Sequence, residues 1–251
     1  WGALVRRSDR RLEAAASLAG LAAAALYLAW IVAVTLRQGQ VPVLSLGQLS
    51  LFLGGLVWIE QSFVQRRVDQ RLFTLLPLAG VIALILVGIA VDPAARAVPE
   101  NLRGWHPTVH ITLSLAGVAM LLGSGVFGAG RVILHGHLRK RDFGVWFQRL
   151  PSLDDLDRLR RLTLGAGWLL VTVSLVSAWV WLRVRPDDTD AMMSHLHPMI
   201  LLAVLITALL AADRLRWLSA QRLASLSFAL SAVVVVLLLV SVVEIFAGRF
   251  A

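Results

Sequence analysis

Seven apolar runs, each about as long as a membrane span, constrain the fold of this chain most strongly. A helix needs about 20 mostly apolar residues to cross the hydrocarbon core of a bilayer. The runs lie at roughly 15–36, 43–64, 72–91, 107–133, 162–182, 197–213 and 223–247. Composition agrees: 58% of the 251 residues are hydrophobic and 16% are charged, against about 45–50% and about 25% in soluble domains. We predict an all-α polytopic membrane helix bundle forming a single membrane domain over residues 1–251.

The basic residues predict how the bundle sits in the membrane. Eighteen of the 24 lysines and arginines fall in the N-terminal segment and in the connections after the second, fourth and sixth runs. Cytoplasmic loops carry an excess of Lys and Arg, so the chain is predicted to have its N-terminus inside and its C-terminus outside. A bacterial-type inner membrane suits this pattern. The excess of 24 basic over 15 acidic residues is then explained by topology and membrane lipids, without a nucleic-acid partner.

The connections between the runs differ in length. Two predicted outer loops, 91–107 and 183–194, are longer than simple turns, and the largest inner connection covers 135–161. Within that connection, Ser152 followed by Asp155 has the spacing of a capping box, with Asp in place of Glu or Gln. We therefore predict that a helix starts there and continues into the fifth run.

The six histidines form three pairs at the ends of the runs, and two pairs share the predicted outer level. One outer pair, His106 and His110, opens the fourth run, and the other, His195 and His197, opens the sixth. A b-type haem takes one imidazole from each of two facing helices in an apolar pocket. His110 and His197 lie just inside the apolar runs and are the predicted metal ligands, with His106 and His195 as alternatives. The inner pair, His135 and His137, fits a solvated interface.

The fourth run (107–133) also has a stripe of small and polar residues at helical spacing. Such a stripe lets a cofactor or another helix approach closely. The stripe consists of His110, Ser114, Gly117, Leu121, Ser124, Gly128 and Arg131. Ser114 and Gly117 are the predicted cofactor-contacting members, and helix packing is the alternative explanation. Trp105 either walls the cofactor pocket or belongs to the interfacial aromatic belt.

Several kinds of chemistry are excluded or not expected. The chain has no cysteine, so covalent c-type haem and thiolate-held clusters are excluded and any haem b is held non-covalently. No phosphate-binding or hydrolase motif occurs, and we predict no catalytic residues and no turnover. Glu60, near the inner end of the second run, is expected to reach the membrane interface.

Three segments in order carry a family resemblance: Val109–Leu115 (VHITLSL), Leu150–Leu159 (LPSLDDLDRL) and Ser194–Pro198 (SHLHP). This order resembles the cytochrome c assembly family of membrane proteins, which includes CcsA-type haem-handling proteins and the shorter HemX/YpjD-like proteins. The resemblance implies haem binding at the outer leaflet by one histidine at the start of each of two spans. His110 matches the first position and His197 the second, with His195 as the register alternative.

The segment before the second histidine departs from the CcsA pattern. CcsA-type proteins have a tryptophan-rich stretch there, whereas residues 183–190 read RVRPDDTD. The chain is therefore closer to the HemX/YpjD-like branch, whose members usually have eight spans and whose HemX-like proteins are implicated in controlling haem synthesis. Its partners would be other membrane subunits or a cytochrome c assembly protein. Two alternatives stay open: a b-haem subunit exchanging electrons with quinone or an outer-face partner, and a haem-free structural subunit of a larger complex.

Overall fold

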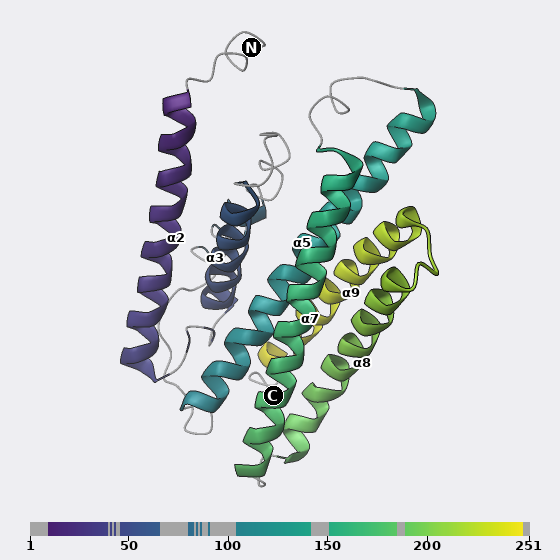
Figure 1. Cartoon of the computed structure of the whole chain (residues 1–251). Helices are drawn as coiled ribbons and strands as arrows, with labels where there is room; N and C mark the ends of the chain where they lie inside the picture. Colours follow the sequence, from purple (N-terminus) through teal and green to yellow (C-terminus); the bar gives the residue numbers. More distant parts are fainter. Residues whose placement is uncertain are drawn as a thin grey trace.

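A computed structural model describes residues 10–39, 41, 43, 46–65, 80–82, 84, 86, 90, 104–141, 151–184 and 189–247. Long helices dominate these described residues, and Figure 1 shows them as an elongated bundle. In chain order they are α2 (Arg10–Gln38), α3 (Leu46–Gln65), α5 (Trp105–Lys140), α7 (Leu153–Val184), α8 (Thr189–Arg214) and α9 (Ala220–Ala247). The predicted all-helical class is confirmed.

Four of these helices are long and apolar enough to cross a membrane within the described part of the chain: Trp105–Lys140, Leu153–Arg183, His197–Arg214 and Ala220–Leu237. Residues 22–38 form a shorter apolar helical stretch. The predicted run 72–91 lies largely outside the described residues, and those of it that are described are helical.

Helix α5 lies at the centre of the packing, with α7 and α9 running antiparallel against it (Figure 1). The small-residue stripe makes this contact. A Cβ at Gly117 would lie 2.7 Å from a Val171 side-chain carbon in α7, and a Cβ at Gly128 would lie 2.6 Å from the backbone oxygen of Ala224 in α9. Side chains larger than hydrogen would separate the helices, so these glycines set the close approach.

The remaining helices attach on two sides of this centre. On one side α2 and α3 pack together, and the Tyr27 hydroxyl donates a 2.7 Å hydrogen bond to the Leu51 carbonyl. Phe52 of α3 joins Leu115 of α5 in one buried cluster. On the other side α8 packs on α7 and α9, where the Trp168 indole donates to the Thr207 hydroxyl at 2.8 Å.

The outward faces of the bundle are apolar. Large apolar side chains project from every long helix, and Leu26, Leu169, Leu201, Val204 and Val236 are each more than half exposed. Scattered exposed apolar residues are normal on any protein, but continuous apolar faces on several helices need another phase to cover them. Lipid supplies that phase, in agreement with the predicted membrane bundle.

The predicted inner connection 135–161 was too long at its first end, because α5 extends past its apolar run. Helix α5 continues to Lys140 and α7 already begins at Leu153. A separate buried cluster explains the extension, since Phe127 and Leu134 of α5 pack against Leu156 and Leu159 of α7. The predicted helix start is confirmed: the Ser152 hydroxyl accepts the Asp155 amide at 3.1 Å and donates to its carboxylate at 2.7 Å.

The predicted outer loop 183–194 was also too long. Helix α7 reaches Val184 and α8 begins at Thr189, so only 185–188 separate the two helices. Pro198 consequently lies inside α8, not at its start.

Candidate functional site

His110 is held by α7 near the start of α5. Its Nδ1 lies 2.9 Å from the backbone carbonyl oxygen of Ser174 and 2.9 Å from the Ser174 hydroxyl. That hydroxyl lies 3.1 Å from the backbone oxygen of His110 and 2.5 Å from the Ser114 hydroxyl. His110 and Ser114 of α5 and Ser174 of α7 therefore form one polar cluster between the two helices.

The Ser174 carbonyl favours one of the two neutral tautomers of His110. A backbone carbonyl only accepts hydrogen bonds, so the neutral ring carries its proton on Nδ1 when it bonds the Ser174 carbonyl. The Ser174 hydroxyl then donates to the carbonyl of His110, and the Ser114 hydroxyl donates to Ser174. No described residue hydrogen-bonds the other ring nitrogen, Nε2. An imidazole whose Nδ1–H is held by a carbonyl presents an Nε2 lone pair suited to a metal.

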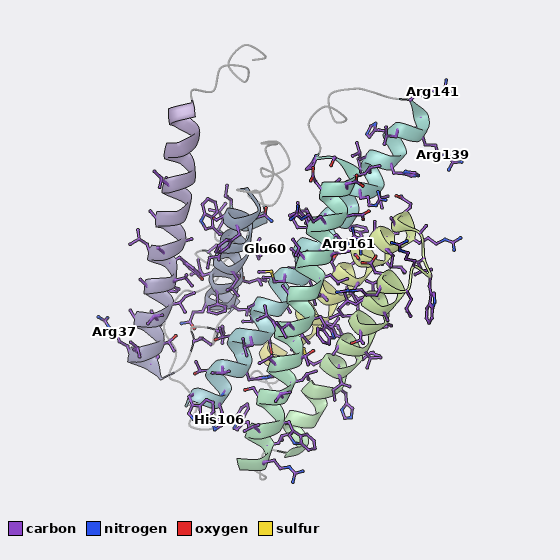
Figure 2. The ribbon with its side chains drawn as sticks, in the orientation of Figure 1. Arg37, Glu60, His106, Arg139, Arg141 and Arg161 are labelled. Atoms are coloured by element: carbon purple, nitrogen blue, oxygen red, sulfur yellow. The ribbon has the colours of Figure 1, made fainter. Side chains whose placement is uncertain are left out.

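The other predicted site residues lie apart from this cluster. Gly117 contacts α7 directly, in the helix–helix packing that was the alternative explanation for the stripe. Trp105 is 66% exposed, and its ring stacks on His106 with centroids 3.5 Å apart. Figure 2 shows His106 at the end of the bundle where Arg37 also lies, with Arg139 and Arg141 at the opposite end.

His110 and His197 are not brought into contact in the described arrangement. His197 lies on α8 with an exposed side chain, and α8 packs on α7 and α9 with no extensive contact to α5. Helix α7 therefore lies between the two histidines. The side chain of His195 is outside the described residues. Within the described part, no group of three or more His, Asp or Glu residues could hold a metal ion, and a two-histidine haem site would not form such a group.

A buried ionic cluster at the other end of α5 was missed by the sequence analysis. Asp157 of α7 lies 3.0 Å from the Arg131 guanidinium of α5 and 3.4 Å from that of Arg160. Arg160 is fully buried and also reaches Asp213 of α8 at 3.6 Å and the Ser227 hydroxyl of α9 at 3.3 Å. The cluster joins four helices.

Charge counting concealed this cluster. Arg131, Arg160 and Arg161 were assigned to the solvated inner side, where loop cations are expected. The available signal was a pair of acids beside basic residues: Asp157 precedes Arg158 and Asp213 precedes Arg214. Acids at the basic ends of apolar helices indicate charge pairing inside a bundle.

Glu60 was wrongly expected at the membrane interface. It is 3% exposed and faces α5, where a Cβ at Gly123 would collide with its carboxylate. Figure 2 shows Glu60 within the bundle and not at either end. The prediction failed because Glu60 lies on the side of α3 that packs on α5, which a single run of apolar residues does not reveal.

The fold and these sites define a class: an all-helical, membrane-type bundle with buried polar clusters. Comparison with known proteins adds a relative. The chain is similar to Protein HemX of Brevibacillus brevis, with 28% identity over 161 residues, covering 62% of this chain and 58% of that protein. The chain spans little more than half the length of the curated relative it matches. No protein-family model matches the chain, and no solved structure is significantly similar to it.

Proposed function

We propose that the chain is a HemX-type integral membrane protein that binds haem b non-covalently at the end of the bundle where α5 begins. The geometry of His110 carries the proposal. Its Nδ1 is held by Ser174, so the ring is oriented and Nε2 is directed away from that bond. An outer hydrogen bond of this kind is the usual companion of a metal-bound histidine. The motifs shared with the cytochrome c assembly family and the similarity to Protein HemX support the same reading.

His197 is the proposed second ligand. It opens the apolar part of α8, and its exposed ring is accessible to a ligand. Both positions therefore offer an imidazole nitrogen, which is the donor that haem iron takes. Helix α7 lies between the two histidines. His195 and His106 are the alternative second ligands. A bound haem supplies the iron's ligand exchange and redox chemistry, and the protein residues hold and orient it.

Optical spectra of the purified chain test the haem proposal. Reduced-minus-oxidised spectra of the wild type should show Soret and α bands that are lost in His110→Ala and weakened or shifted in His197→Ala. His135→Ala is the matched control, because His135 is exposed near the opposite end of α5, and it should leave the spectrum unchanged. A colourless protein, or bands indifferent to His110→Ala, would refute the proposal.

We also propose seven spans with the N-terminus inside, in a bacterial-type inner membrane. Helices α3 and α5 run in the same direction, because Phe52 packs near Leu115 and Glu60 lies against Gly123. The proposed third span, over the run 72–91, would return the chain to the side where α5 begins. Single cysteines can map this topology without background, since the chain has none. Trp217→Cys should be labelled from the cytoplasmic side and Gly39→Cys from the outer side, and labelling of both from one side would contradict the proposal.

A haem-free structural subunit of a larger membrane complex is the second candidate. The observation that favours it is the small-residue stripe of α5, because α7 and α9 already occupy the space beside its small residues. Under this alternative the chain purifies without haem and together with partner subunits. A haem signal that depends on His110 would exclude it.

A further inference from the structure

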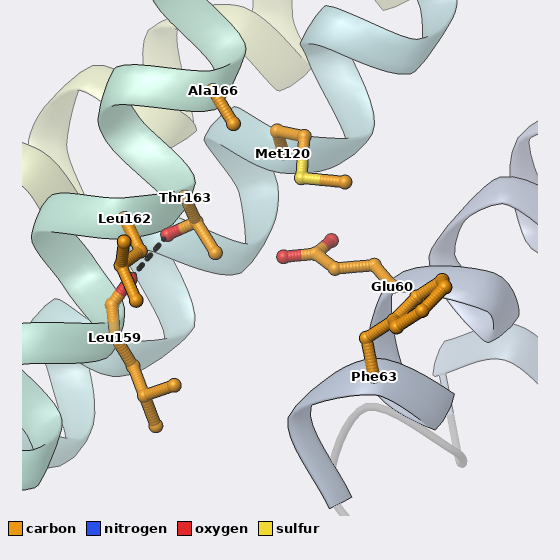
Figure 3. A pocket seen from close by; sticks show the side chains of 7 residues that line it. All are labelled: Glu60, Phe63, Met120, Leu159, Leu162, Thr163 and Ala166. Carbon is orange, nitrogen blue, oxygen red and sulfur yellow. Dashed lines mark hydrogen bonds between the residues drawn. The ribbon is translucent and has the colours of Figure 1, made fainter. Parts of the chain in front are cut away.

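The carboxylate of Glu60 points into a cavity between three helices. Figure 3 shows Glu60 extending from α3 toward Met120 of α5 and Thr163 of α7. The cavity has a volume of about 300 Å³ and is lined by Glu60, Phe63, Met120, Leu159, Leu162, Thr163 and Ala166. That volume is at the lower end of the range for small-molecule sites.

Neither carboxylate oxygen of Glu60 has a hydrogen-bond partner among the described residues. Burying a polar group without a partner is costly, so a carboxyl group in this position needs a reason to be there. Among the described lining residues, no other side chain offers a free donor. The Thr163 hydroxyl is already used within its own helix, where it bonds the carbonyls of Leu159 and Arg160 at 3.0 and 3.2 Å.

The cavity opens on the apolar outer surface of the bundle. Two lining residues at its edge, Phe63 and Leu162, are 63% and 52% exposed. Because the outward faces of these helices are apolar, a molecule entering between Phe63 and Leu162 comes from the lipid phase. The cavity is also separate from the proposed haem site: Thr163 and Ser174 are about 16 Å apart along α7 at the helical rise per residue.

We propose that this cavity binds a membrane-soluble molecule with an apolar body and one hydrogen-bond donor. The donor is a hydroxyl or a protonated amine, and the Glu60 carboxyl group accepts its hydrogen bond. Phe63, Met120 and the leucines contact the apolar body. A donor from the ligand satisfies the carboxyl group that the protein leaves unpaired. This inference does not depend on haem binding.

Matched probes test the donor requirement. The chain is placed in phosphatidylethanolamine–phosphatidylglycerol nanodiscs, and binding of 2-naphthol, 2-naphthylmethylamine and 2-methoxynaphthalene is measured by probe fluorescence, with empty nanodiscs subtracted. The three share an aromatic body and differ in the hydroxyl, the amine or the absence of a donor. We expect the hydroxyl or the amine probe to bind about tenfold more tightly than the methoxy probe, and the preferred one identifies the donor.

Variants locate the effect at the cavity. Glu60→Leu should abolish the preference while the methoxy probe binds as before, and Met120→Trp should fill the cavity and remove binding of all three. Leu169→Trp is the matched control, because Leu169 is exposed on the outer face of α7. It should behave as wild type. If Glu60→Leu does not fold, the comparison of probe binding between Met120→Trp and Leu169→Trp tests whether the cavity is the binding site.

Any of four results overturns the proposal. Two concern the wild type: it does not bind any probe above empty nanodiscs, or it does not distinguish the donor probes from the methoxy probe. Two concern the variants: Glu60→Leu keeps the preference, or Met120→Trp retains binding. The haem spectrum is recorded on the same Glu60→Leu sample and should be unchanged, which separates failure here from failure of the haem proposal.

Discussion

Removing Asp157 should destabilise the bundle more than any other single change of charge. Its carboxylate is the shared partner of Arg131 at 3.0 Å and Arg160 at 3.4 Å. The three side chains are only 10%, 12% and 1% exposed respectively. Arg160 keeps Asp213 at 3.6 Å, whereas no other described carboxylate pairs with Arg131. Asp157→Asn thus leaves the Arg131 guanidinium buried without an opposite charge.

The size of the effect follows from that uncompensated charge. Breaking a buried ion pair by removing one partner costs about 3–5 kcal/mol. The Asn amide oxygen still accepts a hydrogen bond, so we expect a loss of about 3 kcal/mol in the free energy of unfolding. Adding Arg131→Met to Asp157→Asn removes the stranded charge and should recover about 1–2 kcal/mol, a coupling typical of residues in direct contact.

Equilibrium unfolding by SDS in mixed micelles, followed by helical circular dichroism, measures these free energies. Asp154→Asn is the matched control, because Asp154 is exposed on the same helix. It should cost less than about 1 kcal/mol, the value of an acidic residue at a helix N-terminus. Equal losses for Asp157→Asn and Asp154→Asn would refute the reasoning, as would a double variant less stable than Asp157→Asn alone.

Further predictions concern packing, capping and one hydrogen bond, each measured by the same unfolding assay. Gly128→Ala should lose about 1–3 kcal/mol, because its Cβ would lie 2.6 Å from a backbone oxygen of α9 and a backbone cannot shift cheaply; Gly136→Ala, with open space around it, should be neutral or gain up to about 1 kcal/mol. Ser152→Ala should cost about 1 kcal/mol by removing the N-cap of α7, while Ser152→Asp should be near wild type. Tyr27→Phe should cost about 1 kcal/mol through loss of its 2.7 Å hydrogen bond. Gly136→Ala as harmful as Gly128→Ala, or a neutral Ser152→Ala, would contradict these expectations.

The helices were predictable because apolar runs report burial or lipid contact directly. The start of α7 was predictable too, since the Ser152 hydroxyl satisfies the Asp155 amide in the first turn by a local hydrogen bond. The length of α5 was not, because α5 extends past its apolar run by packing Leu134 against Leu156 and Leu159 of α7. That contact joins residues distant in the sequence, and no local pattern encodes it.

The candidate site was predictable only in part for the same reason. Helical spacing correctly placed His110 and Ser114 on one face of α5, and the structure adds Ser174 from α7 as their partner. Grouping His110 with His197 rested on membrane level and on the family resemblance. Level gives the position of a residue along a helix but not the direction its side chain takes around the bundle, and α7 lies between the two.

The positions of the buried polar groups indicate which helix contacts are fixed and which can open. The ionic cluster ties α5, α7, α8 and α9 together through Arg131, Asp157, Arg160, Asp213 and Ser227. No ion pair of the described residues joins α3 to these four helices. Where α3 contacts α5, the carboxyl group of Glu60 has no hydrogen-bond partner among the described residues. Buried ion pairs specify a fixed arrangement, whereas an apolar contact around an unsatisfied group is more easily opened. The seam beside α3 is therefore where a ligand can enter without breaking the bundle, and a donor supplied to Glu60 would strengthen the join. Binding of the preferred naphthyl probe should accordingly raise the unfolding midpoint of the wild type and leave that of Glu60→Leu unchanged.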